Sequence, residues 1–296
     1  MRAACIGECM IELSEMPDGR LSRAYGGDTL NTAVYMARLG LGVDYVTALG
    51  DDSFSDEMLA GWQAEGVGTG LVARLPGRVP GLYIIQTDAR GERRFSYWRD
   101  SAPARELFAL PQTPEIVAAL AAYDLLFFSG ITLSLYGEAG RARFFEALDR
   151  ARGQGARVAF DTNFRPRGWP DRAVAQAAYG QALERADIVL ASAEDLQLLY
   201  GDEDAARRLL DRPPAELVLK LPEPACRVVT ADGLDRVVTA RPVARVVDTT
   251  AAGDSFAAAY LADRLAGAVV GHPGAIIPRA AMPAAQRPQE SGRTPA

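Results

Sequence analysis

The sequence contains a single histidine, His272, and a single lysine, Lys220, among its 296 residues. A Ser-His-Asp triad or a zinc site built from several histidines needs residues that this chain does not have. A Walker-type phosphate loop requires a lysine followed by serine or threonine after a glycine-rich turn, whereas Lys220 is followed by Leu221 and preceded by an apolar run. Any phosphate chemistry in this protein must therefore use another arrangement of residues.

Cysteines and long apolar stretches are also few. The three cysteines, Cys5, Cys9 and Cys226, are an odd number, and we expect reduced thiols rather than a disulfide. No apolar stretch approaches the length of a membrane helix, and Glu8 and Glu12 interrupt the N-terminal apolar run before a signal-peptide core is complete. These absences predict a cytoplasmic protein.

Acidic side chains outnumber basic ones. The 38 acidic and 32 basic side chains give a formal net charge of −6, which repels phosphate backbones and anionic membrane surfaces. We therefore expect neither nucleic acid nor a membrane as a partner. With 49% apolar residues, the chain has enough material for one large α/β domain or two small ones.

Short apolar runs alternate with helix-like segments along most of the chain. The runs that are typical of buried parallel strands are residues 4–6, 44–48, 125–128, 158–160, 188–190 and 217–220. Apolar residues at helical spacing occupy residues 29–39, 138–152 and 172–185. This alternation predicts an α/β fold with a doubly wound, mostly parallel sheet flanked by helices.

Two segments depart from the alternation, at about residues 9–25 and 79–100. Each contains two short strand-like runs around a turn signal, Met16-Pro17-Asp18-Gly19 in the first and Asp88-Ala89-Arg90-Gly91 in the second. We expect the two hairpins to form a small antiparallel β lid beside the main sheet.

The end of the chain has a different composition. Residues 284–296 are rich in Pro, Ser, Gln and Arg and have too little apolar surface to offset the entropy of ordering. We therefore expect one domain over residues 1–283, followed by a disordered tail.

The most informative segment is Asp248-Thr249-Thr250-Ala251-Ala252-Gly253-Asp254, which precedes a helical pattern. Small residues at a helix start allow several backbone N–H groups to point at one anion, and the helix dipole adds to the attraction. Asp254 would stand beside that anion, where a carboxylate can take a proton from a hydroxyl that attacks a phosphoryl group. The alternative is a strand–turn–helix junction with Asp254 as the N-cap, and spacing alone does not decide between the two.

This segment resembles the C-terminal signature of the ribokinase-like (PfkB) carbohydrate kinases. Gly26-Gly27-Asp28-Thr29-Leu30-Asn31-Thr32-Ala33 resembles their N-terminal sugar-binding turn, in the form found in 2-keto-3-deoxygluconate kinases. The likeness extends from Gly7 to Pro283, and it implies a ribokinase-like fold that uses ATP and Mg²⁺. It further implies that Asp254 is the catalytic base and that the anion hole is formed by Ala251, Ala252 and Gly253.

The glycine turn allows two interpretations. The residues alone favour a helix start capped by Asp28 or Thr29. The resemblance instead implies that Gly27, Asp28, Asn31 and the catalytic Asp254 contact the sugar.

Two arginines and a tyrosine match other substrate positions of the resembled kinases. Tyr83 and Arg99 match residues that close over the substrate, and an arginine there can bind a carboxylate through two parallel hydrogen bonds. Arg165 follows a predicted strand, at the edge of the sheet where such folds bind ligands. The resemblance places Arg165 between the acid substrate and the transferred phosphate; the alternative is a surface ion pair with Asp161.

The nucleotide and metal side is implied by resemblance as well. Ser192-Ala193-Glu194-Asp195 stands in the place of an Asn-x-x-Glu motif that holds magnesium and phosphate through water, with Ser for Asn and Asp for Glu. Glu194 and Asp195 are thus the expected metal side, through water. The expected nucleotide contacts are Asn163, Arg165, Ser192, Lys220, Thr249 and Gly253.

Two departures from the resembled kinases fall on the nucleotide side. A Gly-x-x-Gly loop is usual after the strand that ends at Lys220, but this chain has Pro222-Glu223-Pro224-Ala225, and proline offers no amide. Beyond Gly267, residues 268–271 lead directly into His272-Pro273-Gly274, so that on the order of a dozen residues, one average helix, are missing.

The resemblance implies ATP-dependent phosphorylation of 2-keto-3-deoxygluconate to its 6-phosphate. A fructokinase or ribokinase acting on a neutral sugar is the nearest alternative, and Arg99 and Arg165 argue against it. The alternative from another class is a sugar-acid-binding protein with impaired use of ATP, because both departures lie where the nucleotide would bind. The lid edge also suggests a homodimer.

Overall fold

The computed structural model describes residues 2–16, 18–87, 93–202, 204–211, 213–241, 244 and 249–262. The predicted turn at residues 88–91, Asp248, the segment after Gly267 and the tail at 284–296 lie outside the described residues.

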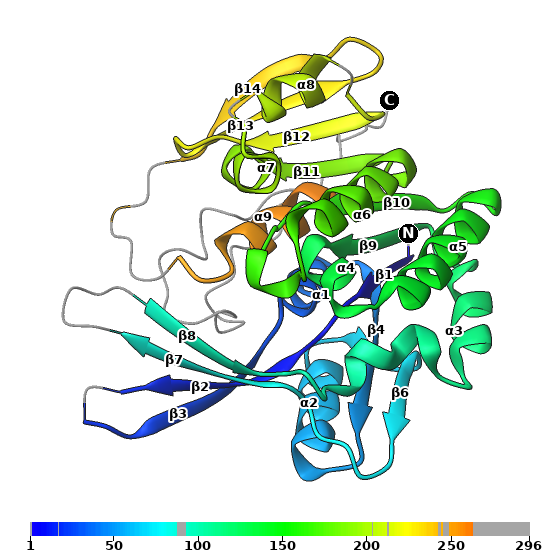
Figure 1. The fold of residues 1–296 in the computed structure, drawn as a ribbon, viewed down its shortest axis with the longest axis vertical. Helices are drawn as coiled ribbons and strands as arrows, with labels where there is room; N and C mark the ends of the chain where they lie inside the picture. Colours follow the sequence, from blue (N-terminus) through cyan, green and yellow to red (C-terminus); the bar gives the residue numbers. More distant parts are fainter. Residues whose placement is uncertain are drawn as a thin grey trace, which may run out of the picture.

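The described residues form an α/β fold around a mostly parallel sheet (Figure 1). Across the sheet, the strands are β14 (Asp235–Thr239), β13 (Ala225–Thr230), β12 (Glu216–Lys220), β11 (Ile188–Ser192), β10 (Arg157–Asp161), β9 (Leu125–Ser129), β1 (Arg2–Ile6), β4 (Gly42–Gly50) and β5 (Val67–Gly68), with β6 (Val72–Leu75) also paired to β4. Strand β13 pairs antiparallel with both β12 and β14, and every other pairing in this sheet is parallel. The predicted doubly wound sheet is therefore confirmed.

A second, four-stranded sheet extends from the main one, as Figure 1 shows. Its strands are β3 (Leu21–Gly26), β2 (Met10–Glu15), β7 (Leu82–Thr87) and β8 (Arg93–Trp98). Each hairpin is antiparallel as predicted, but β2 and β7 pair parallel, so the lid sheet is mixed rather than antiparallel. Turn signals fix the pairing within a hairpin, whereas the pairing between hairpins depends on how both leave the main sheet.

Helices cover both faces of the main sheet. One face packs against α1 (Asp28–Arg38), α2 (Ser53–Ala64) and α9 (Ala252–Ala262). The other face packs against η1 (Pro103–Ala109), α3 (Thr113–Leu120), α4 (Gly130–Leu135), α5 (Glu138–Gly153), η2 (Pro166–Gly168), α6 (Arg172–Arg185), α7 (Ala193–Tyr200) and α8 (Ala205–Asp211). No helix in the described part of the chain is long and apolar enough to cross a membrane.

Local signals explain where several helices begin and end. Asp52 caps α2 by accepting hydrogen bonds from the amides of Phe54 and Ser55, and Asp171 caps α6 through the amide of Val174. Gly201, at a φ of 69°, ends α7 in the left-handed region that favours glycine. Apolar side chains then bury the helices against the sheet, and Phe144 of α5, Tyr179 of α6 and Phe160 of β10 are fully enclosed.

Candidate active site

The carboxyl ends of the parallel strands bring polar residues to one edge of the sheet. The chain leaves β1 for β4 on one side, and it returns to β9 on the other, so β1 marks the point where the strand order reverses. Ligands bind at such points in open α/β sheets. Asp161 ends β10, Ser192 ends β11 and Lys220 ends β12, so the chemistry predicted from separate motifs meets here.

The start of α9 is arranged for binding an anion. Ala251 has a φ of 59°, in the left-handed region, which turns the chain sharply into the helix. The amide of Ala252 donates to Thr249 O at 3.1 Å, and that of Ser255 donates to Ala251 O at 2.9 Å. The amides of Gly253 and Asp254 donate no hydrogen bond to another described residue. They point out of the positive end of the helix.

Asp254 lies in the first turn of α9 and is held by α1. Asn31 Nδ2 donates to Asp254 Oδ2 at 2.8 Å, and Thr32 Oγ1 donates to Asp254 O at 3.2 Å. Burial, and next the negative charge of Asp28, raise the pKa of Asp254 to about 7, against the opposing hydrogen bond from Asn31. Asp254 is not an N-cap, because α9 begins two residues earlier. The carboxylate is thus poised to gain or lose a proton near neutral pH.

A second group of charges lies between α1 and the strand ends. Asp28 begins α1 and accepts a hydrogen bond from Asn163 Nδ2 at 2.8 Å, and burial raises its pKa. Lys220 Nζ lies 3.1 Å from both carboxylate oxygens of Asp161. Lys220 also faces the start of α9, because a Cβ added at Gly253 would lie 3.9 Å from Nζ. The chain's only lysine therefore stands beside the anion-binding turn.

Arg165 lies on the outer side of this group. Its Nη1 contacts Asp195 Oδ1 at 3.4 Å, and 58% of its side chain is exposed. Asp195 also accepts a hydrogen bond from Thr162 Oγ1 at 3.2 Å, and burial raises its pKa. The predicted alternative, an ion pair between Arg165 and Asp161, is wrong, because Asp161 is paired with Lys220.

The glycine turn lies against the end of β1. Gly27 is the N-cap of α1, and neither of the predicted caps, Asp28 or Thr29, takes that place. A Cβ at Gly27 would come 2.1 Å from Glu8 O, so only glycine allows this approach. Arg99 Nη2 donates to Glu8 Oε2, and the pair joins the lid to the main sheet.

Tyr83 lies on the lid with its ring buried. Its hydroxyl donates to Glu12 Oε2, and burial, with the nearby Glu12 charge, raises the pKa of Tyr83. The hydroxyl would lie 2.5 Å from a Cβ at Gly26, so it reaches the glycine turn. The lid residue Tyr83 is thus in place beside the predicted sugar contacts.

A family model described as "pfkB family carbohydrate kinase" matches residues 2–285, which is nearly the whole chain. The protein is a PfkB carbohydrate kinase.

Relatives and solved structures agree with this assignment. The chain is 44% identical to the 2-dehydro-3-deoxygluconokinase of Dickeya dadantii (strain 3937), over 95% of this chain and 98% of that protein. It is 43% identical to the 2-dehydro-3-deoxygluconokinase of Escherichia coli (strain K12), over 96% of this chain and 99% of that protein. The crystal structure of a fructokinase with bound ATP from Xylella fastidiosa superposes with a TM-score of 0.78 at 28% identity, covering 95% of each chain.

The structure brings most of the predicted site residues of this PfkB kinase into two adjoining groups. The group predicted to face the sugar contains Gly27, Asp28, Asn31, Tyr83 and Arg99. The group predicted to face the phosphates contains Asn163, Arg165, Ser192, Asp195, Lys220, Thr249, Ala251, Ala252, Gly253 and Asp254. Glu194 is exposed in the first turn of α7, away from these contacts.

Sequence reasoning missed the partners of several of these residues. Glu8 and Glu12 served only to exclude a signal peptide, yet they are 3% and 8% exposed and bind Arg99 and Tyr83. The available signal was two carboxylates inside an otherwise apolar N-terminal run, because a buried charge is retained only with a partner. Asp161 enters the sequence analysis only in the alternative of a surface ion pair with Arg165, although its side chain is 7% exposed.

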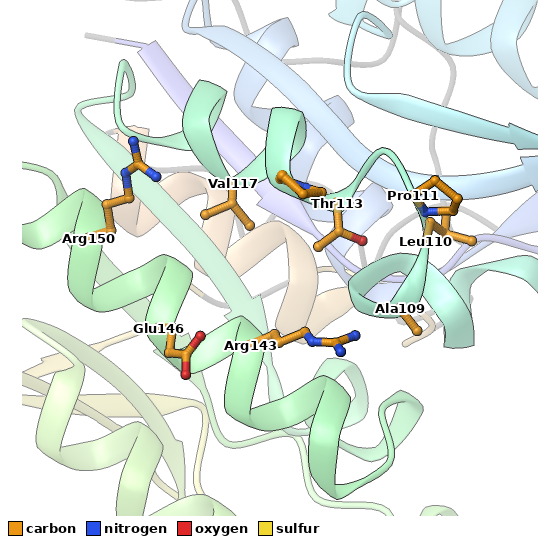
Figure 2. A pocket seen from close by; sticks show the side chains of 9 residues that line it. Ala109, Leu110, Pro111, Thr113, Val117, Arg143, Glu146 and Arg150 are labelled. Atoms are coloured by element: carbon orange, nitrogen blue, oxygen red, sulfur yellow. The ribbon is translucent and has the colours of Figure 1, made fainter.

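A pocket of about 770 Å³ lies away from this site, between η1, α3 and α5 (Figure 2). Its lining residues are Ala109, Leu110, Pro111, Thr113, Pro114, Val117, Arg143, Glu146 and Arg150. None of them follows the carboxyl end of a parallel strand of the main sheet. The candidate site of this PfkB kinase is therefore identified by converging chemistry rather than by the shape of a cavity.

The loop between β12 and β13 has few amides to offer a nucleotide. Pro222 and Pro224 have none, Leu221 N donates to Ala225 O at 3.0 Å, and Ala225 N donates to Glu223 O at 2.6 Å. Among these described loop residues, Glu223 alone keeps an uncommitted amide. The first departure that the sequence predicted is thus visible in the hydrogen bonding of the loop.

Proposed function

We propose that this PfkB kinase transfers the γ-phosphoryl group of ATP to the terminal hydroxyl of 2-keto-3-deoxygluconate, also called 2-dehydro-3-deoxygluconate. The observation that supports this most strongly is the 44% identity with a 2-dehydro-3-deoxygluconokinase over 95% of the chain. The arrangement of Asp254, Asn31 and the start of α9 fits the same reaction.

Asp254 is the proposed general base. Asn31 fixes one oxygen of its carboxylate, which leaves the other to accept the proton of the sugar hydroxyl. The hydroxyl oxygen forms a bond to the γ-phosphorus, the bond from that phosphorus to the bridging oxygen breaks, and ADP leaves with the electron pair. A pKa near 7 keeps a useful fraction of Asp254 ionised while making it basic enough to take the proton.

The amides at the start of α9 and the ammonium of Lys220 are proposed to stabilise the charge on the transferred group. Ala251, Ala252 and Gly253 shape the turn, and the amides of Gly253 and Asp254 are uncommitted. Preorganised donors of this kind require little rearrangement during the reaction. Asn163, Ser192 and Thr249 line the same edge and are proposed to contact the nucleotide.

Magnesium would shield the charges of the ATP phosphates. Within the described residues, no group of three or more Cys, His, Asp and Glu side chains is arranged to hold a metal ion. This fits magnesium, which keeps several waters and binds mainly through phosphates and one or two carboxylates. We propose that Asp195 and Glu194 face the ion through water, with Asp195 the nearer to the site because its carboxylate contacts Arg165.

An assay on the purified chain with ATP, Mg²⁺ and 2-keto-3-deoxygluconate tests this proposal. We expect release of ADP together with a 6-phosphate that is visible as a phosphomonoester by ³¹P NMR. Fructose and ribose, assayed in parallel, test the alternative of a neutral-sugar kinase. Faster turnover of either sugar than of the acid would reject the substrate that we propose.

A second candidate function is binding of the sugar acid with impaired use of ATP. The single uncommitted amide in the loop between β12 and β13 favours it. Titration with ATP in the presence and absence of the sugar acid distinguishes the two, because a kinase must bind both.

Two smaller proposals concern the setting of the protein. We expect it to act in the cytoplasm, where ATP is available. We also expect a homodimer through the lid, whose sheet exposes 51% of Leu21, 43% of Tyr97 and 59% of Trp98. Sedimentation equilibrium on the intact chain measures the oligomeric state directly.

A further inference from the structure

Glu8 lies where the main sheet and the lid meet. It stands two residues beyond the end of β1 and is 3% exposed. Arg99, its partner, directly follows the last residue of β8, and 19% of the arginine side chain is exposed. The ion pair therefore links the central strand to one strand of the lid.

The contact between the two side chains is incomplete. Arg99 Nη2 donates to Glu8 Oε2, but Glu8 Oε1 and Arg99 Nε are both buried without a partner among the described residues. A carboxylate and a guanidinium can form two parallel hydrogen bonds, and unpaired buried polar atoms are costly. The two side chains therefore keep hydrogen-bonding capacity that their single contact does not use.

Glu8 touches the predicted sugar contacts in two ways. Its carbonyl lies directly under Gly27, and its carboxylate holds Arg99. A Cβ at Gly81 would lie 3.1 Å from both Glu8 Oε1 and Arg99 Cβ, so the pair packs closely against the lid backbone. Burial raises the pKa of Glu8, and the positive charges of Arg99 and Arg105 oppose that shift.

We propose that Glu8 is a positioning residue for the sugar site: it holds Arg99 by one nitrogen and so orients the partly exposed arginine side chain to bind an oxygen of the sugar acid. Without the carboxylate, the partly exposed guanidinium is free to turn toward solvent, and the site must order it again whenever a substrate binds. The inference rests on the proposed function, because it takes the ligand to be a sugar acid.

A double-mutant cycle on the full chain tests this role. The dissociation constant of 2-keto-3-deoxygluconate is measured by calorimetry for the wild type, Glu8→Gln, Arg99→Ala and the double variant. We expect each single variant to bind about tenfold or more weakly, which is the usual effect of losing a hydrogen bond to a charged group. The double variant should bind no more weakly than Arg99→Ala, because Glu8 acts through Arg99. In steady state, KM should rise more than kcat falls.

Glu12→Gln is the matched control, because Glu12 is also a buried carboxylate near the lid but binds Tyr83 instead of Arg99. Because Glu12 does not act through Arg99, the loss in affinity caused by Glu12→Gln should multiply with the loss caused by Arg99→Ala. The proposal would be overturned if the losses in affinity caused by Glu8→Gln and Arg99→Ala multiplied in the double variant. An unchanged dissociation constant for Glu8→Gln would overturn it as well.

The proposal can still be tested if Glu8→Gln does not fold or if the chain does not bind the sugar acid. Should Glu8→Gln not fold, Glu8→Asp keeps the charge but draws back the carboxylate, and normal sugar binding by that variant would overturn the proposal. A wild-type chain that binds no sugar acid contradicts the proposed function instead, and the same cycle then tests Glu8 with whichever sugar the chain does bind.

Discussion

At the scale of single residues, the environment of Asp254 makes its carboxylate more basic and also makes its ionised form unfavourable. Burial and the nearby charge of Asp28 disfavour its ionised form, while Asn31 and the positive end of α9 favour it. A carboxylate in an ordinary exposed position would be fully ionised at neutral pH but a weak base. The same rise in pKa that suits proton transfer means that ionised Asp254 destabilises the folded protein.

We predict that Asp254→Asn lowers kcat by about a hundred- to ten-thousandfold, the usual contribution of a general base. Asparagine keeps the shape, and the amide of Asn31 can still find an acceptor there, so sugar binding should persist. Single-turnover kinetics with calorimetry of the sugar acid measure the two effects separately. Near-normal turnover would remove Asp254 from the mechanism.

The raised pKa of Asp254 also predicts how activity and stability depend on pH. The base must be ionised, so kcat/KM should fall about tenfold per pH unit below about 7. Because the folded pKa lies above the unfolded value, the native state binds more protons between about pH 4 and 7, and the free energy of unfolding should decrease as pH rises through that window. Asp254→Asn should abolish the dependence of activity on this group and make the stability slope shallower, while Asp28 and Asp195, whose pKa values burial also raises, keep their share of it. Thermal melts from pH 4 to 8 provide the check, and an identical slope in the variant would contradict it.

At the scale of elements, the start of α9 stores backbone strain next to Asp254, the proposed general base. Ala251 holds a φ of 59°, a conformation that costs a residue with a Cβ about 1–2 kcal/mol. The strain is maintained because α9 packs against α1 and its side chains fill the core between them. The turn thereby presents its amides in a fixed direction.

We predict that Ala251→Gly raises the free energy of unfolding by about 0.5–1 kcal/mol, because the relief of strain exceeds the extra entropy of glycine in the unfolded chain. Ala252→Gly is the matched control. It lies in the first turn of α9, where glycine brings only the entropy cost, so that variant should be less stable than the wild type. Urea denaturation of both variants decides the matter, and the prediction fails if the two shifts have the same sign.

The loop between β12 and β13 leads to a prediction about ATP. We expect sugar-acid affinity within about 1 μM to 1 mM, the ordinary range for enzyme substrates, and weaker binding of ATP. Pro222→Gly restores one amide and should tighten ATP binding while leaving sugar affinity unchanged. Calorimetry with each ligand separately tests this expectation. Micromolar binding of ATP by the unaltered chain would show that other residues replace the missing amides.

At the scale of the whole molecule, the site is an assembly of segments from both ends of the chain. Asn31 and Asp254 are 223 residues apart in sequence yet share a hydrogen bond, and Asp28 and Asn163 are 135 apart. The lid adds Tyr83 and Arg99 from a third region. The candidate site therefore depends on how the lid sheet, α1 and the strand ends meet.

We expect Arg165 to contribute to the discrimination between the sugar acid and a neutral sugar. Its guanidinium is the more exposed of the two candidate arginines and shares its charge only with Asp195 among the described ion pairs. Arg165→Ala should lower kcat/KM for 2-keto-3-deoxygluconate and for fructose unequally. The loss for the acid should be larger by about tenfold or more, because only the acid carries a carboxylate that forms a charge-assisted hydrogen bond with Arg165. Competition between the two sugars in one assay measures this ratio. Equal losses would assign Arg165 to the phosphate alone.

Local sequence patterns were enough to predict the main parallel strands, several helices and a candidate anion-binding turn. Helical spacing predicted residues 172–185, which the structure contains as α6, and the buried runs predicted the parallel strands within a few residues. The small residues before Asp254 predicted an anion-binding turn, and α9 begins among them. These features depend on neighbours a few residues apart, so local patterns record them.

The pairing of the charged residues and the joining of the two hairpins are set by contacts between distant parts of the chain. Glu8 and Arg99 are separated by 91 residues, Glu12 and Tyr83 by 71, and Asp161 and Lys220 by 59. Each residue type has many possible partners at such separations, and no local spacing selects one of them. The parallel pairing of β2 with β7 is likewise set by the path of both hairpins out of the main sheet. Burial of a charge requires a counterion, but packing of the whole chain determines which residue supplies it.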